Sequence, residues 1–140
     1  MNCSRERYRR PRGTSTLELI VVLPTLLFMM FAIVELSRMW LYLNVVTQAA
    51  REGARVAVVT PVPTSGFESG PAVARIDAVL AGANLTKTDP SGVTCATPCA
   101  QDSLVTATVT VNFKTLFPVF LPWWGGAGVN LTDTAVMRYE

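Results

Sequence analysis

The sequence has no histidine among its 140 residues. Histidine is the side chain that most often serves as a general base or a metal ligand near neutral pH, so its absence removes the usual catalytic and metal-binding group. Neither a nucleophile motif nor a carboxylate cluster outside the long N-terminal helix described below replaces it. We therefore expect a protein that is not an enzyme and that holds neither a metal ion nor a cofactor.

Cysteine is also scarce, with three residues in all. Cys95 and Cys99 stand in the sequence C-A-T-P-C, and two thiolates without histidine or further cysteines cannot complete a zinc site. Two alternatives remain: a disulfide that closes a small loop, if this part of the chain faces an oxidising compartment, or two free thiols. Cys3 is not preceded by the apolar run of a lipoprotein signal.

Basic charge is concentrated in the first 13 residues, which hold five arginines and one acidic residue, Glu6. Residues 14–140 carry seven Lys+Arg and nine Asp+Glu, so their net charge is −2. No basic patch is therefore available for nucleic acid. A short basic segment before an apolar run is typical of a cytoplasmic flank, which predicts an N-terminus in the cytoplasm and a C-terminal part outside it.

The apolar run has Glu18 near its start and no charged residue from Leu19 to Val34. Leu17–Leu36 comprises 20 residues, which is enough to cross about 30 Å of hydrocarbon. A cleaved signal peptide would need a shorter apolar core and a small-residue cleavage site, which the following ELSRMWLYLN lacks. Pro24 removes one helical hydrogen bond, so we expect a kink or a loosened turn that serves packing between helices, with the Thr25 hydroxyl available to the freed carbonyl.

The helical pattern continues beyond the apolar run, and we predict one helix over residues 15–59, about 68 Å long. Gly53 lies among alanines, so this face should let another helix or strands approach closely. Trp40 and Tyr42 fall where an interfacial aromatic belt is expected. Two i,i+3 charge pairs are expected to support the exposed helix surface: Glu35 with Arg38, and Glu52 with Arg55.

Residues 60–140 predict a small α+β domain. A second helix should begin at Pro71, and the segment Asn84–Gln101 reads as a loop with a short strand near Val93. Apolar and polar residues alternate over 104–113 and 129–139, which predicts an antiparallel hairpin packed on the exposed part of the first helix. The connection between these strands is aromatic and either closes the core or forms a partner surface; its large residues are Phe117, Phe120, Trp123 and Trp124.

The leader and the start of the apolar run resemble the processing site of type IV pilin-like precursors. The resemblance implies that a membrane peptidase cuts between Gly13 and Thr14, which makes Glu18 the fifth residue of the mature chain. A carboxylate at the membrane edge is costly, and the new ammonium group of Thr14, in the same chain or a neighbour, is its natural counter-ion. A glycine before the cut bond lets the backbone lie close to the peptidase.

Four further segments sharpen this resemblance, and together they look like the TadE-like family, the minor pseudopilins of tight-adherence pilus systems. They are E-L-I-V-V-L-P (18–24), V-E-L-S-R (34–38), T-Q-A-A-R-E-G-A-R (47–55) and A-V-M-R-Y-E (135–140). The major pilins of these systems have tyrosine directly after the glutamate, whereas Leu19 stands here, which argues for a minor component.

The resemblance implies a structural component for assembly of a tight-adherence type IV pilus, located in the bacterial inner membrane. Its implied partners are a prepilin peptidase, other pilins or pseudopilins, the inner-membrane assembly platform and the membrane itself, and no nucleic acid. The expected organisation is a cleaved leader (1–13), a helix (14–59, membrane part about 17–36) and an extracytoplasmic domain (60–140). The alternative is a membrane-anchored binding module or adhesin that does not enter a pilus.

Overall fold

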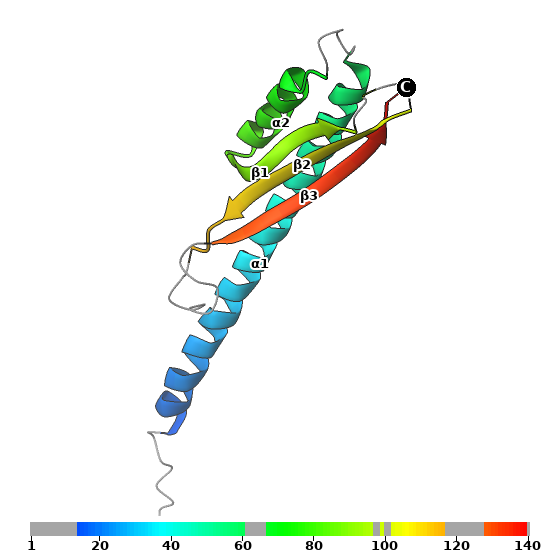
Figure 1. Cartoon of the computed structure of the whole chain (residues 1–140). Helices are drawn as coiled ribbons and strands as arrows, with labels where there is room; N and C mark the ends of the chain where they lie inside the picture. Colours follow the sequence, from blue (N-terminus) through cyan, green and yellow to red (C-terminus); the bar gives the residue numbers. More distant parts are fainter. Residues whose placement is uncertain (1–13, 61–66, 97–98, 100–101, 117–127, 140) are drawn as a thin grey trace, which may run out of the picture. The chain divides into compact units, whose positions relative to one another are not determined.

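The computed structural model has five elements, and it has the predicted α+β class (Figure 1). A long helix and a short one precede three antiparallel strands. The elements are α1 (Thr14–Val59), α2 (Gly70–Gly82), β1 (Lys87–Cys95), β2 (Leu104–Phe113) and β3 (Val129–Arg138). The structure describes residues 14–60, 67–96, 99, 102–116 and 128–139, with side chains from Thr16 onward. The chain forms two compact units, residues 1–34 and 35–140, which are described separately.

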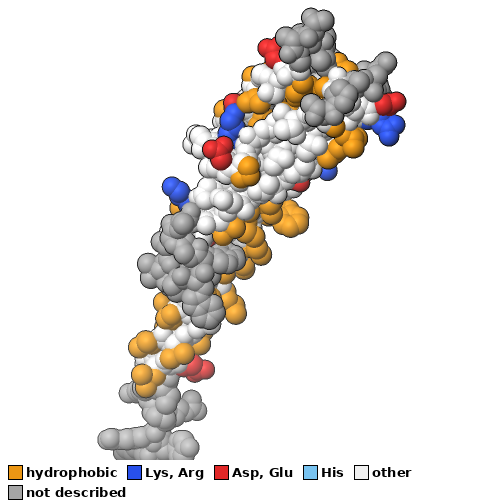
Figure 2. Space-filling model, in the orientation of Figure 1, with side chains coloured by type: hydrophobic (Ala, Val, Ile, Leu, Met, Phe, Trp, Pro, Cys, Tyr) orange, Lys and Arg blue, Asp and Glu red, His pale blue; other side chains and the backbone are white. Residues whose placement is uncertain are grey.

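The described part of the first unit is the apolar beginning of α1. From Thr16 to Val34 every side chain is exposed, and Figure 2 shows hydrophobic side chains over the visible surface of this segment. A helix whose exposed side chains are almost all apolar is suited to lipid. Within the described residues, α1 is long and apolar enough to cross a membrane. α1 continues through Pro24, and the Thr25 hydroxyl donates to the Val21 carbonyl (3.1 Å), not to the carbonyl of Ile20 that proline frees.

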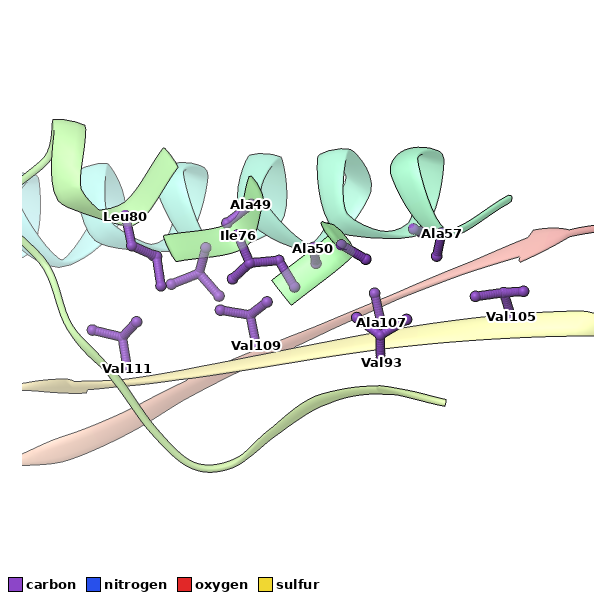
Figure 3. Close-up of a cluster of buried hydrophobic side chains, with 13 residues drawn as sticks. Ala49, Ala50, Ala57, Ile76, Leu80, Val93, Val105, Ala107, Val109 and Val111 are labelled. Atoms are coloured by element: carbon purple, nitrogen blue, oxygen red, sulfur yellow. The ribbon is translucent and has the colours of Figure 1, made fainter. Parts of the chain in front are cut away.

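The second unit is a helix layer on one face of a three-stranded sheet. The sheet order is β1-β2-β3, and both neighbouring pairs are antiparallel. Figure 3 shows the apolar side chains between the helices and the strands. β2 supplies the centre of this core, because its alternate residues are buried as the sequence predicts: Val105, Ala107, Val109, Val111 and Phe113.

The α1 side of the core consists mostly of small residues. Val46 and four alanines are at most 1% exposed: Ala49, Ala50, Ala54 and Ala57. Gly53 lies where α2 comes nearest, because a Cβ added there would stand 2.5 Å from Cγ1 and 2.6 Å from Cδ1 of Ile76. The same Cβ would be 3.8 Å from the Cβ of Ala107 in β2. The close approach expected at Gly53 is thus made by both α2 and the sheet.

The ends of α2 follow from its sequence. Pro71 stands in the first turn, where its missing N–H costs nothing, and the helix begins one residue before it. Ala72, Ile76 and Leu80 form the buried face. At the other end Asn84 adopts a positive φ of 56°, and the N–H of Leu85 donates to the Leu80 carbonyl (2.9 Å). This Schellman-type ending turns the chain toward β1.

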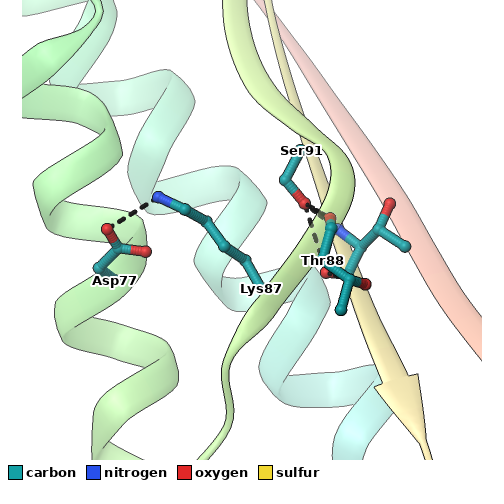
Figure 4. Close-up of polar contacts among 5 residues, drawn as sticks. Asp77, Lys87, Thr88 and Ser91 are labelled. Carbon is teal, nitrogen blue, oxygen red and sulfur yellow. Dashed lines mark hydrogen bonds and ion pairs between the residues drawn. The ribbon is translucent and has the colours of Figure 1, made fainter.

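The strand predicted near Val93 is present, but it is longer than expected: β1 has nine residues, so most of the segment read as a loop before Cys95 is a strand. The alternating pattern fails because the pairing with β2 shifts register between Thr88 and Gly92. In this irregular stretch Ser91 Oγ accepts the N–H of Thr110 (2.9 Å), a bond that a backbone carbonyl would otherwise accept (Figure 4). β2 therefore makes this segment a strand, and an ion pair between Lys87 and Asp77 (2.8 Å) links its start to α2.

Gly53→Ala tests the close approach between α1 and α2. We expect the free energy of unfolding to fall by about 1 kcal/mol, because overpacking costs about 1–3 kcal/mol and the gain in helix propensity is about 1 kcal/mol. Urea unfolding of the detergent-solubilised protein, followed by circular dichroism, measures it.

The matched control is Gly82→Ala, since a Cβ there meets no atom within 4 Å and should not reduce stability. In addition, Ile76→Ala should cost less in the Gly53→Ala background than alone, because the new methyl group fills part of the cavity. A Gly53→Ala protein as stable as the parent, with additive effects of the two changes, would show that the helices are not in tight contact.

Candidate functional site

The residues expected at the processing site lie at the beginning of α1. Thr14 is the first helical residue, and Gly13 lies outside the described residues. Glu18 is exposed on the first turns of the helix, among the exposed apolar side chains of Leu17, Leu19 and Ile20. An unburied carboxylate on an otherwise apolar helix surface is available to a group from outside the chain's own folded domain.

The two cysteines near the end of β1 form a disulfide in the structure, with a Cα–Cα distance of 5.7 Å. Cys95 is the last residue of β1 and pairs with Val105 of β2, so the small loop is attached to the sheet. The sequence leaves open a disulfide or two free thiols, and the structure has the disulfide. Among the described residues no group of three or more His, Cys, Asp or Glu side chains is placed to hold a metal ion.

The proposed aromatic partner surface cannot be placed, because Phe117, Phe120, Trp123 and Trp124 lie outside the described residues. The residues on either side of the connection are described. Leu116 is bonded to Glu35 of α1, and Gly128 lies against the end of β2. Gly128 has a φ of 81°, and a Cβ there would stand 2.5 Å from the Phe113 carbonyl oxygen, so only glycine fits at this position.

Glu35 is the polar residue whose role the sequence did not reveal. The pair with Arg38 forms at 2.9 Å, but it does not lie on an exposed surface as predicted, because Glu35 is 6% exposed. Its other carboxylate oxygen accepts the backbone N–H of Leu116, 81 residues later in the chain. Both oxygens thus have a partner, which offsets the cost of burying the charge.

Aromatic rings complete this group, which we call the Glu35 cluster: Glu35, Arg38, Tyr42, Phe113 and Leu116. The Arg38 guanidinium lies 5.5 Å from the ring centroid of Phe113 and 5.9 Å from that of Tyr42, within the range of a cation–π contact. The two rings meet edge to face at 5.3 Å. Tyr42 therefore packs inside the domain and does not join an interfacial belt.

Trp40, the other residue of the predicted belt, is 66% exposed. It lines a shallow hollow with Leu36 and Ser37 on the outer surface of α1. An exposed tryptophan beside leucine a few residues after the apolar run remains compatible with the predicted interfacial position.

The spacing of residues along α1 places Glu35 on the buried face of the helix. Glu35, Tyr42 and Ala49 are seven residues apart and so lie on nearly the same face of the helix, which is the face that contacts β2. The sequence could not show that the N–H of Leu116 lies opposite Glu35, because 81 residues separate them.

The other predicted charge pair joined Glu52 to Arg55, but Glu52 has a different partner in the structure. The Glu52 carboxylate lies 3.6 Å from Nε of Arg75 in α2, and the ion pair described for Glu52 is this one and not one with Arg55. Two shallow hollows of about 440 and 370 Å³ flank Glu52 on the outer side of the helices. Both partners are partly exposed, so this pair contributes little to stability.

These features define a class of protein in which one helix supplies both an apolar segment able to cross a membrane and the support of a small α+β domain. Residues 13–55 match the family model described as TadE-like protein, which confirms the resemblance for the segments between residues 18 and 55; the segment 135–140 lies outside the match. The match suggests a component associated with Tad pili. No curated protein and no solved structure matches the chain.

The Glu35 cluster can be tested by Glu35→Ala, which leaves the Leu116 N–H and the Arg38 charge without their partner. We expect the free energy of unfolding to fall by about 2–3 kcal/mol. The Leu116 amide should also exchange with deuterium faster. Glu35→Gln keeps an acceptor for Leu116 and should lose less.

Glu52→Ala is the control, since it breaks a partly exposed pair and should cost less than about 1 kcal/mol. If Glu35→Ala and Glu52→Ala lower the free energy of unfolding equally and the Leu116 amide exchanges at its original rate, the Glu35 cluster does not stabilise the domain as described.

Proposed function

We propose that the chain is a minor pseudopilin-like structural component needed for assembly of a tight-adherence type IV pilus. The observation that carries this proposal is the extent of the family match. It begins at Gly13 and ends at Arg55, so it includes the predicted cleavage site, Glu18 and the block Thr47–Arg55. In the structure these features lie on one helix, except for Gly13.

The exposed surface of α1 supports a role in helix packing. From Thr16 to Val34 no side chain is buried, so this segment presents an apolar surface suited to lipid or to other apolar helices. A pseudopilin needs a helix of this kind, because the same surface must contact lipid before assembly and neighbouring helices afterwards. Pro24, which has no described role in the folded domain, would shape that contact.

Two independent features support an orientation with the domain outside the cytoplasm. The five arginines of the leader favour a cytoplasmic N-terminus under the positive-inside rule. The Cys95–Cys99 disulfide lies in the second unit, and structural disulfides persist in oxidising compartments. A single-pass inner-membrane protein satisfies both conditions. The proposed partners are a prepilin peptidase, other pilins and the assembly platform.

The proposed maturation step is cleavage between Gly13 and Thr14. We expect N-terminal sequencing or intact-mass measurement of the protein from cells with an active prepilin peptidase to give a chain that begins at Thr14. Gly13→Leu should keep the leader, because the larger side chain blocks the close approach of the backbone to the peptidase.

Wild-type protein from cells without the peptidase is the control, and it should also retain the leader. An intact leader in peptidase-positive cells would disprove the processing step. It would favour a membrane-anchored binding module that does not enter a pilus.

Glu18 is proposed to place the subunit in register, through the new ammonium group of Thr14 in its own chain or a neighbour. Glu18→Ala should therefore be cleaved normally and yet fail to support pilus formation, which immunoblotting and electron microscopy of the cells can measure. Glu52→Ala, which changes a carboxylate on the outer part of α1, is the matched control and should leave piliation intact. Normal piliation with Glu18→Ala would contradict the registration role.

A further inference from the structure

The two edges of the sheet are built differently. The β1 edge contains Pro90 and a register shift between Thr88 and Gly92, and Lys87 links it to α2. Such features prevent another strand from pairing with an edge. β3 pairs with β2 over all ten of its residues without a shift, and it contains neither proline nor glycine. Its second side has no neighbouring strand within the described sheet.

The hydrogen bonds show which groups of β3 point away from the sheet. The Tyr139 N–H donates to the Ser103 carbonyl (2.8 Å), so residue 139 and, by alternation, the odd-numbered residues of β3 face β2. The even-numbered residues direct their N–H and C=O groups outward: Asn130, Thr132, Thr134, Val136 and Arg138. The bond from the Thr110 N–H to Ser91, on the far side of β2, agrees with this assignment, because Thr110 pairs with Thr132.

Asp133 occupies the centre of this edge. Its side chain accepts the outward N–H of Thr134 (2.8 Å), which is the middle one of the five. The ion pairs described in the structure do not include Asp133. The middle of this edge thus carries a carboxylate that accepts the Thr134 N–H and forms no ion pair among the described residues.

A second copy of this chain is a poor occupant of the edge. If two β3 strands paired antiparallel about the centre of this edge, their Asp133 carboxylates would be direct neighbours on one face of the joined sheet. Like charges at such positions oppose pairing.

We propose that the free edge of β3 accepts an extended segment of a different protein, and that this segment places a Lys or Arg side chain beside Asp133. The outward C=O groups and the outward N–H groups other than that of Thr134, which Asp133 accepts, supply the main-chain hydrogen bonds, as in other cases of strand addition. The charge of Asp133 supplies selectivity for a basic residue and against a second copy. The inference depends on the sheet alone and holds whether or not the protein enters a pilus.

Thr134→Pro tests the use of the edge. The proline ring stands at an outward position where an added strand would pair, and the N–H that it removes bonds to the Asp133 side chain and not to β2. Proline is tolerated at such edge positions, so the fold should persist. Thr134→Ala, which keeps the N–H, is the matched control. The probe is a fluorescent ten-residue peptide with the sequence of Leu104–Phe113, because this strand, β2, already pairs with β3. In the peptide a lysine replaces the valine that corresponds to Val109, which pairs with Asp133 in the sheet.

Binding of this peptide to the detergent-solubilised full chain is measured by fluorescence anisotropy. We expect Thr134→Pro to weaken binding at least about tenfold relative to Thr134→Ala, and binding to slow deuterium exchange at the outward amides of Thr132 and Val136. Equal binding by the two variants, or no slowing at these amides, would overturn the proposal.

The charge requirement is tested by exchanging signs. A second peptide carries glutamate in place of the lysine, and the wild-type chain should prefer the lysine peptide by about threefold. Asp133→Lys should reverse this preference, which also keeps the proposal testable should Thr134→Pro fail to fold. The same preference in both proteins would exclude selection by Asp133.

A photo-crosslinking amino acid in place of Val136, which is 55% exposed beside the edge, identifies the occupant in cells. The expected product joins the chain to a different protein and is reduced by both Thr134→Pro and Asp133→Lys. A product that joins two copies of this chain, or one that neither variant changes, would show that the edge does not bind the proposed segment.

Discussion

The close packing of the small-residue face of α1 on β2 is the contact on which the rest of the domain depends. Four alanines and Gly53 have small side chains that project little from the helix, so the strand and α2 can both approach the helix backbone. The contact also has a fixed register along its length. From Tyr42 to Gly53 α1 rises about 16 Å, and from Phe113 to Ala107 β2 rises about 20 Å, so the two run side by side in opposite directions.

This arrangement explains how one helix serves two environments. Up to Val34 its side chains are exposed on all sides, and at Glu35 the first buried side chain appears. The carboxylate of Glu35 holds the segment that follows β2 against α1, and the rings of Tyr42 and Phe113 pack beside it. The end of the domain is thereby fixed to the residue that directly follows the uncharged run. In the proposed pseudopilin, the exposed segment is then free to exchange lipid for neighbouring helices.

Much of the fold could be predicted because its patterns are local. The helical period of α1 and α2 and the alternation in β2 and β3 each lie within one element, and the structure has all four. β1 could not be predicted in the same way, since Ser91 replaces a backbone partner and the register shift breaks the alternation. The partners of Glu35 and Glu52 were also missed, because Leu116 and Arg75 come from other elements.

The sequence by itself determined the apolar segment, its charged leader, the class of the fold and the TadE-like motifs, since each of these depends on residue type and short spacing. The tertiary structure alone decided that Glu35 is buried, that β1 extends over nine residues, and that β3 is an edge strand of the described sheet with Asp133 near its centre. These properties depend on contacts between residues that are distant in the chain, and the helical or strand periodicity of a single segment does not show which distant residues meet. Contacts between distant segments also bring α2 and β2 close to α1 at Gly53.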